Sequence, residues 1–264
     1  MMIVNTGFVR RKIRAASLRI FNFIENNGCA DFYKNGEEKF LMDLLEHFSK
    51  TEPKKVIFDI GANVGDYSAL ALELARKKRV DIELHLFEPT KSCFTTLEKR
   101  FRKNNNNLKL NNFGVSDVNS ESVIFYDQEQ SGMASIYQRN LTHYNLQLDL
   151  KEEIQLRRLD NYINEHDIAH IDFIKIDIEG HELRALEGGG DYIDGRYIDY
   201  IQFEYGGANL DSCISLMDIY AYLESRNFLI AKIMRNGIEL REYRPYMEHF
   251  EYSNYVAISK NILR

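Results

Sequence analysis

The residues best suited to chemistry lie in one short stretch, which runs from Lys175 to Glu182 and reads KIDIEGHE. It places three carboxylates and a histidine close together: Asp177, Glu179, Glu182 and His181. Because side chains alternate along an extended strand, Asp177 and Glu179 should point to the same side. Burying so much charge is costly unless the cluster binds something. The stretch therefore indicates a functional site.

Three roles are open for this cluster. It could position a methyl donor and its acceptor, or supply a general base, for which His181, Asp177 and Glu179 are the candidates. It could also hold a divalent cation, with Asp177, Glu179 and Glu204 as oxygen ligands. Helix capping is the structural alternative for Glu179, since acidic groups are favourable near a helix start, but capping does not account for the whole cluster.

A second motif, DIGANVG at residues 59–65, ends an apolar run and precedes a helical pattern. Glycines let the backbone turn sharply and let a ligand approach, and the helix start offers free amides. The dinucleotide fingerprint needs a third glycine, and a carboxylate here would repel a diphosphate. It suits a cationic amino acid end instead, such as that of S-adenosylmethionine. The predicted cofactor-binding residues are Asp59, Gly61, Asn63 and Gly65; the alternative is a strand-end turn without a ligand.

Two further strand ends complete the predicted cofactor site. Glu88, followed by Pro89, ends the next apolar run, where an acidic residue can accept both hydroxyls of a ribose. Backbone amides around Val115 and Ser116 could meet an adenine edge, although a plain turn fits that segment nearly as well. Asp177 would complete the site, because ligands lie across the carboxyl ends of the strands in a doubly wound sheet.

The elements that position these residues alternate between strand and helix patterns. Strands are predicted at 56–60, 82–87, 108–115, 172–178, 200–204, 228–233 and 255–259, and helices at 66–78, 90–103, 181–187 and 212–226. Such alternation predicts an α/β fold with a doubly wound, Rossmann-like, mostly parallel sheet. The segment 121–160 interrupts the alternation with two more strands, at 123–126 and 154–157. It is interpreted as an insertion that shapes the substrate site.

The first part of the chain predicts two amphipathic helices, at 8–25 and 37–49. We therefore divide the chain into an N-terminal helical extension, 1–52, and a catalytic domain, 53–264, with Pro53 at the boundary. The first helix carries an apolar stripe beside a basic face. The stripe is expected to pack on the body or on a second subunit as a homodimer, and the alternative is contact with an anionic membrane or an acidic substrate. The stripe comprises Val9, Ile13, Ala16, Ile20 and Ile24.

Composition narrows the choice of partners and compartment. The net charge of −6 makes nucleic acid a poor candidate partner. Three widely spaced cysteines without a CxxC pair predict free thiols in a reducing compartment. Neither a membrane-spanning run nor a signal-peptide pattern is evident, so a cytoplasmic protein is expected.

These motifs together resemble the FkbM family of methyltransferases over roughly residues 55 to 207. The resemblance lies in 56–66, in Phe87-Glu88-Pro89, in 159–162 and above all in 172–189. It implies a seven-stranded sheet and methyl transfer from S-adenosylmethionine, commonly to a hydroxyl of a natural product or of a glycan sugar. It also implies that Asp177 lies beside the reacting methyl group. The alternatives are an NAD-dependent oxidoreductase and a non-catalytic protein that binds S-adenosylmethionine.

Overall fold

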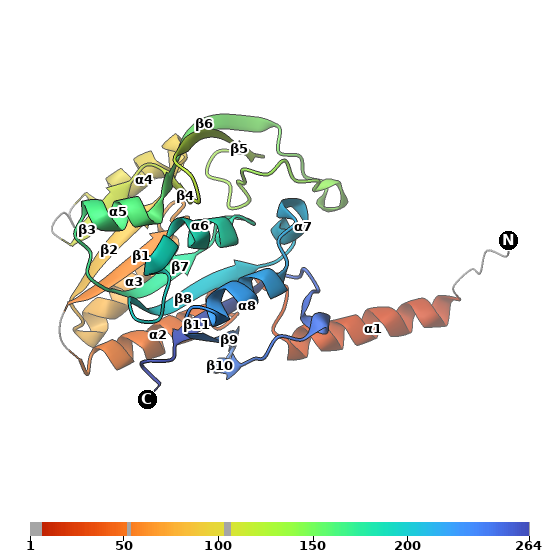
Figure 1. Cartoon of the computed structure of the whole chain (residues 1–264). Coiled ribbons are helices and arrows are strands. Elements are labelled where there is room, and N and C mark those ends of the chain that lie inside the picture. Colours follow the sequence, from red (N-terminus) through yellow and green to blue (C-terminus); the bar gives the residue numbers. More distant parts are fainter. Residues whose placement is uncertain (1–6, 52–53, 103–106, 264) are drawn as a thin grey trace.

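The computed structural model describes residues 7–51, 54–102 and 107–263 (Figure 1). Its centre is an eight-stranded sheet in the order β10-β9-β11-β8-β7-β1-β2-β3. The strands are β1 (Lys55–Ile60), β2 (Ile82–Phe87), β3 (Leu108–Asn111), β7 (Ile171–Ile176), β8 (Ile198–Tyr205), β9 (Phe228–Met234), β10 (Gly237–Leu240) and β11 (Ser253–Ser259). Strands β3, β2, β1, β7 and β8 pair in parallel, whereas β11 lies antiparallel to β8 and β9.

The doubly wound, mostly parallel sheet is confirmed, with one strand more than the seven expected. The additional strand is β10, a short edge strand that pairs antiparallel with β9. Its side chains are mostly exposed, so it lacks the apolar run by which the buried strands are recognised. From β1 the chain winds to β2 and β3 on one side, and β7 and β8 lie on the other. The switch point of the sheet therefore lies between β1 and β7.

Helices cover both faces of the sheet, and each face has its own apolar core. One face carries α2 (Glu37–Phe48), α3 (Asp66–Lys78) and α4 (Lys91–Phe101); the other carries α5 (Leu159–Glu165), α6 (Glu182–Gly188) and α8 (Leu216–Glu224). The helix predicted at 212–226 is wrong as one element. A short α7 (Ala208–Ser212) ends at Cys213, which has a positive φ, and α8 begins anew at a capping box between Ser215 and Asp218.

The predicted strand 108–115 is also wrong as one element. Only β3 joins the large sheet, while β4 (Gly114–Ser116) belongs to a second sheet with β5 (Ser120–Tyr126) and β6 (Leu150–Arg158), in the order β4-β6-β5. The two strands predicted within the insertion are confirmed as parts of β5 and β6. The small sheet lies above the carboxyl end of the large one (Figure 1).

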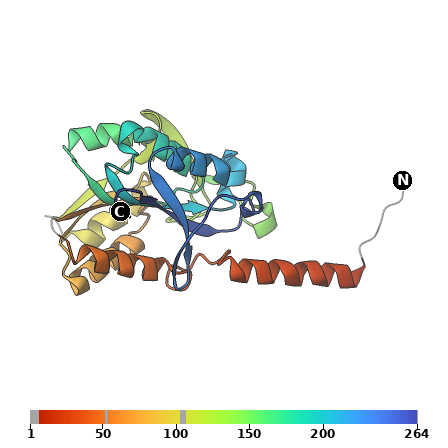
Figure 2. The ribbon, with the colours of Figure 1, turned by 60° about the horizontal axis from the view of Figure 1, so that its bottom comes forward.

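The two helices of the predicted N-terminal extension pack differently. Helix α2 contributes Phe40, Leu41, Leu44, Leu45 and Phe48 to the core beneath the sheet. Helix α1 (Phe8–Ile24) buries no residue and extends beyond the body in both views (Figures 1 and 2). The expectation that its stripe packs on the body is therefore wrong. The predicted domain boundary at 52–53 lies outside the described residues.

Two expectations from composition can be compared with the structure. All three cysteines are free thiols, as expected. Within the described ranges, no helix combines the length and the apolar character that crossing a membrane requires.

Candidate active site

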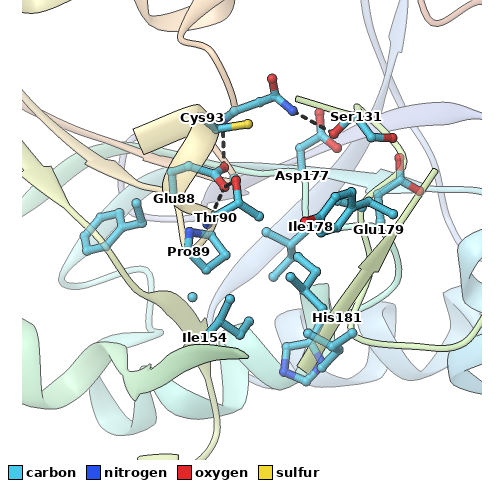
Figure 3. A pocket seen from close by; sticks show the side chains of 18 of the residues that line it. Glu88, Pro89, Thr90, Cys93, Ser131, Ile154, Asp177, Ile178, Glu179 and His181 are labelled. Carbon is cyan, nitrogen blue, oxygen red and sulfur yellow. Dashed lines mark hydrogen bonds between the residues drawn. The ribbon is translucent and has the colours of Figure 1, made fainter. Parts of the chain in front are cut away.

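The predicted site residues meet at the carboxyl edge of the sheet, at the switch point between β1 and β7, where ligands bind in open α/β sheets. A cavity there is bordered by the ends of β1, β2 and β7 and by the small sheet. Glu88, Pro89 and Thr90 lie on one side of it, and Asp177, Ile178 and His181 lie on the other (Figure 3). Val115, Ile154 and Leu156 give it an apolar floor.

The two glycines of the DIGANVG motif, Gly61 and Gly65, serve packing at the cavity edge. Gly61 has φ +87°, and a Cβ there would lie 1.9 Å from the carbonyl oxygen of Asp177. Only glycine therefore lets the turn after β1 approach the end of β7 this closely. Gly65 has φ +83° and precedes α3, with a Cβ position 2.6 Å from the ring of Phe101. Gly61 borders the cavity, whereas Gly65 packs behind it against α4.

Glu88 ties the glycine turn to the end of β2. Its Oε2 accepts the backbone N–H of Asn63 at 2.9 Å, and its Oε1 accepts the N–H and the hydroxyl of Thr90 at 2.8 and 2.6 Å. Burial raises the pKa of Glu88. A carboxylate offers about four lone-pair sites, so about one remains for a ligand. The amide of Asn63 donates to the carbonyl oxygen of Ser131 at 2.9 Å, which joins the turn to the insertion.

Asp59 lies beside a second cavity rather than in the first. The two cavities share Gly61, Asn63 and Asp177 in their walls. Asp59 is 1% exposed, its Oδ2 accepts the hydroxyl of Ser68, and its Oδ1 has no hydrogen-bond partner among the described residues. Burial raises the pKa of Asp59. An unpartnered buried carboxylate oxygen is unusual in a native fold and indicates a missing cationic or hydrogen-bonding ligand.

A buried lysine supplies the only strong positive charge described in the wall of this second cavity. Lys175 donates to Asp177 Oδ2 at 2.8 Å. Burial alone would lower the pKa of Lys175, but the charges of Asp177, Asp59 and Glu37 outweigh burial and raise it. Burial alone would raise the pKa of Asp177, but the charge of Lys175 and the hydrogen bonds from Glu204 and Lys175 together outweigh burial and lower it. Asp177 is therefore an ionised carboxylate, and its side chain is 31% exposed.

Glu37, at the start of α2, is a wall residue that sequence reasoning missed. It accepts hydrogen bonds from Asn35, Gln202, Tyr252 and Asn254, at 2.6 to 3.2 Å. These four donors fill its acceptor sites, so Glu37 contributes charge and rigidity rather than a free hydrogen bond. No sequence signal could have found it, since Gln202 and Asn254 lie far along the chain.

The predicted cation ligands do come together. One carboxylate oxygen from each of Asp177, Glu179 and Glu204 lies within 4.8 Å of the others. Burial and the neighbouring carboxylates raise the pKa of Glu204 well above its ordinary value. Burial also raises the pKa of Glu179 to about 8, against the opposing charge of Arg139, whose Nη1 donates to it. The trio could hold a divalent cation, although Lys175 and Arg139 already offset part of its charge.

His181 is held between two hydroxyl groups. Its Nε2 lies 2.9 Å from Ser116 Oγ, and its Nδ1 lies 2.9 Å from Tyr137 OH. Burial lowers the pKa of His181 to about 4, so the ring is neutral at pH 7. Ser116 therefore supports His181 from behind the cavity wall, while its neighbour Val115 borders the cavity itself. The arrangement favours a positioning role for His181 over that of a free base.

Glu182 organises the loop between β7 and α6. Its Oε1 accepts the backbone N–H groups of Ile178 and Gly180, both at 3.1 Å. Burial raises the pKa of Glu182 to about 7. Glu182 is therefore the member of the motif that shapes the loop, and not one that faces the cavity.

The insertion closes over the site through contacts with the motif. Ser135 Oγ donates to the carbonyl oxygen of Glu179 at 2.8 Å, Tyr137 contacts His181, and Arg139 bridges Glu179 and Asp211. Sequence reasoning assigned the insertion to the substrate site but named none of these residues. Their polar surroundings offer no pattern that would single them out.

Comparison with known proteins identifies the class. The model of the methyltransferase FkbM domain matches residues 59–230, so the chain carries a methyltransferase domain. The chain belongs to the FkbM methyltransferase family. This confirms the resemblance and favours methyl transfer over the oxidoreductase alternative.

Individual relatives are distant. The AMB antimetabolite synthetase AmbE of Pseudomonas aeruginosa is 28% identical over 166 residues, which are 52% of this chain and 8% of AmbE. A crystal structure of methyltransferase FkbM from Methylobacillus flagellatus is 17% identical, with a TM-score of 0.48 and coverage of 93% of this chain and 60% of the other. TrmK of M. capricolum, solved with S-adenosylhomocysteine, is 12% identical, with a TM-score of 0.42 and coverage of 82% and 67%. The similarity to these structures carries no inference about function.

Proposed function

We propose that the chain transfers the methyl group of S-adenosylmethionine to a hydroxyl oxygen of a natural product or of a sugar in a glycan. The observation that carries the proposal is the unpartnered Oδ1 of Asp59 beside the second cavity. S-adenosylmethionine brings an ammonium and a sulfonium, and an ammonium would satisfy that oxygen. The wall also holds Glu37 and Asp177 against a single lysine, so a cationic ligand would offset the excess negative charge.

In this proposal the cofactor extends across both cavities. The amino acid end lies in the second cavity beside Asp59 and Gly61, and the adenosine end lies in the first cavity beside Glu88. Glu88 accepts one ribose hydroxyl through its remaining lone pair, and not both as the sequence suggested. Pro89, Asn63 and Val115 form the adjacent wall. Ser116 and Gly65 support this wall from behind without contacting the cofactor.

When bound, the cofactor supplies a methyl carbon that bonds to the acceptor oxygen as its bond to sulfur breaks, with the electron pair left on sulfur. The protein aligns the acceptor oxygen and accepts its proton. We assign the proton to Asp177, which is ionised and borders both cavities. Glu179 is the second candidate, since a pKa of about 8 makes it the stronger base but leaves it mostly protonated at pH 7. His181 positions the motif.

The acceptor class is inferred from one relative and from the charge of the chain. AmbE is described as an antimetabolite synthetase, which favours a natural-product acceptor, but the chain spans 8% of AmbE. The net charge of −6 argues against nucleic acid. A divalent cation at Asp177, Glu179 and Glu204 would help to orient an acceptor with two oxygens. A cytoplasmic location stays a prediction.

The proposal is tested by calorimetric titration of S-adenosylmethionine, S-adenosylhomocysteine and NAD into the wild type and two variants. We expect binding of the first two ligands, weakened roughly 10-fold in Asp59→Asn and in Glu88→Gln, because each loses a charge-assisted contact. The matched controls are Asp43→Asn and Glu98→Gln, both at exposed helix positions. Repeating the titration with Mg²⁺ and then with a chelator tests the cation site.

Each outcome separates the alternatives. Binding of NAD alone would support the oxidoreductase, and no binding of any ligand would overturn the cofactor site. If S-adenosylmethionine binds, hydroxyl acceptors are screened by release of S-adenosylhomocysteine, with Asp177→Asn as the inactive variant that still binds. Turnover that stays level above pH 6 supports Asp177 as proton acceptor, whereas turnover that rises toward pH 8 supports Glu179. Cofactor binding without turnover on any acceptor would favour the non-catalytic alternative.

A further inference from the structure

Helix α1 presents an apolar stripe that the described structure leaves largely uncovered, with Arg235 stacked on Phe23 at the base of the helix. Its large side chains are widely exposed, from 59% for Ile13 to 67% for Val9. Turned by 100° per residue, these side chains fall on one face together with Ala16, Ile20 and Phe23. Single exposed apolar residues are ordinary, but a continuous stripe along a whole helix indicates a binding surface.

The same helix is strongly cationic. Residues 8–24 include Arg10, Arg11, Lys12, Arg14 and Arg19 and no acidic residue, although the whole chain has a net charge of −6. Within the described ranges none of these side chains forms an ion pair. Arg11 and Arg14 lie opposite the stripe, while Arg10, Lys12 and Arg19 flank it. Positive charge therefore lies along both edges of the surface that the stripe would contact.

The base of the helix is anchored to the body. Glu25 pairs with Lys232 and Arg241 at 3.5 and 3.2 Å, and the amide of Asn26 donates to the carbonyl oxygens of Asn35 and Ile233. Phe21 packs edge to face on Tyr246. The helix therefore leaves the body in a defined direction and holds its stripe away from the fold (Figures 1 and 2).

A second copy of α1 is a poor occupant for this stripe. The spacing of Val9, Ile13, Ala16 and Ile20 would suit a coiled coil, but it lasts fewer than the three to four heptads that such an assembly needs. The flanking positions are Arg10, Lys12, Ser17 and Arg19. Two copies would bring like charges together along the seam, which opposes pairing.

We propose that α1 binds an anionic lipid surface and holds the catalytic domain at that surface. An interfacial helix buries its apolar face at the boundary of headgroups and acyl chains, while its basic side chains contact anionic headgroups. The flanking basic residues Arg10, Lys12 and Arg19 have long stems that let the charge reach the headgroups as the stripe enters. This single occupant accounts for both the apolar and the cationic character of the helix.

The test is co-sedimentation of the full chain with vesicles of phosphatidylcholine alone and of phosphatidylcholine mixed with phosphatidylserine. We expect binding only to the mixed vesicles, weakened by added salt. Arg10→Gln with Arg19→Gln should weaken it roughly 30-fold, since each basic side chain near an anionic membrane contributes about fivefold. Ile13→Ser with Ile20→Ser should weaken it at least about 10-fold, because the stripe no longer enters the interface.

The matched control is Arg76→Gln with Lys99→Gln, which removes the same charge from exposed positions of α3 and α4 and should bind as the wild type does. Unchanged thermal unfolding of every variant would exclude misfolding as the cause. The proposal is overturned if the wild type binds neither vesicle, if it binds both equally, or if the α1 variants bind normally. A dimer in solution that Ile13→Ser with Ile20→Ser dissociates, without vesicle binding, would assign the stripe to a second copy.

Discussion

Helices α1 and α2 share an amphipathic sequence pattern, but they differ in what they contact in the structure. Both are amphipathic, and both precede the catalytic domain. Helix α2 buries its stripe against the sheet and carries Glu37 into the wall of the second cavity, whereas α1 has no buried residue. An amphipathic pattern therefore predicts a helix with an apolar face, but it does not predict what that face contacts.

The largest expected effect concerns the core contact of α2. Leu45 is 0% exposed, so Leu45→Ala should lower the free energy of unfolding by about 2–5 kcal/mol through lost burial and a cavity. Leu18→Ala makes the same change on the exposed surface of α1 and should cost less than about 0.5 kcal/mol. Urea denaturation measures both. Equal losses would show that α1 packs in solution as firmly as α2 does.

A smaller effect should follow at the polar end of α2. Glu37→Gln leaves hydrogen-bond donors facing an amide group, so the free energy of unfolding should fall by about 1–3 kcal/mol. Binding of S-adenosylhomocysteine should also weaken, because one negative charge leaves the wall of the second cavity. The neighbouring Glu38→Gln, outside the cavity wall, is the control for both measurements. If Glu37→Gln changes stability and ligand binding no more than Glu38→Gln does, α2 packs on the sheet without contributing to the second cavity.

The smallest effect is expected for the stripe of α1 itself. Ile13→Ser with Ile20→Ser should leave the melting temperature unchanged within error, because neither side chain is buried. Differential scanning calorimetry at several protein concentrations provides the measurement. A fall in melting temperature that depends on protein concentration would show that the chain self-associates through α1. Both helices would then bury their apolar stripes.

Some residues of the candidate site were predicted from sequence patterns, and others were found only in the folded structure. The glycine turn, Glu88 and the Asp177 motif were predicted because each stands at the end of an apolar strand, and parallel strands end at one edge. Lys175 had a signal that went unused, a lysine between two isoleucines of a mostly apolar strand. Arg139 and Tyr137 had none, since an irregular insertion has no period that fixes where its side chains point.

Errors at element boundaries have local physical causes. The run 108–115 looks like one strand, but a break between β3 and β4 sends its second half into another sheet. The segment 212–226 looks like one helix, but Cys213 in a left-handed conformation and the Ser215 cap divide it. Hydrophobic patterns do not record such turns, because only a few backbone angles change.

The sequence by itself determined the class of fold and the family, and it pointed to the residues that gather at the candidate site, because apolar periodicity and short motifs are local properties of the chain. Tertiary structure alone decided that Asp59 and Glu88 border different parts of the site, that His181 is locked between Ser116 and Tyr137, and that α2 joins the core while α1 does not. These outcomes depend on contacts between segments far apart in the chain. Such contacts form only where the whole fold brings burial, charge and hydrogen-bond partners together.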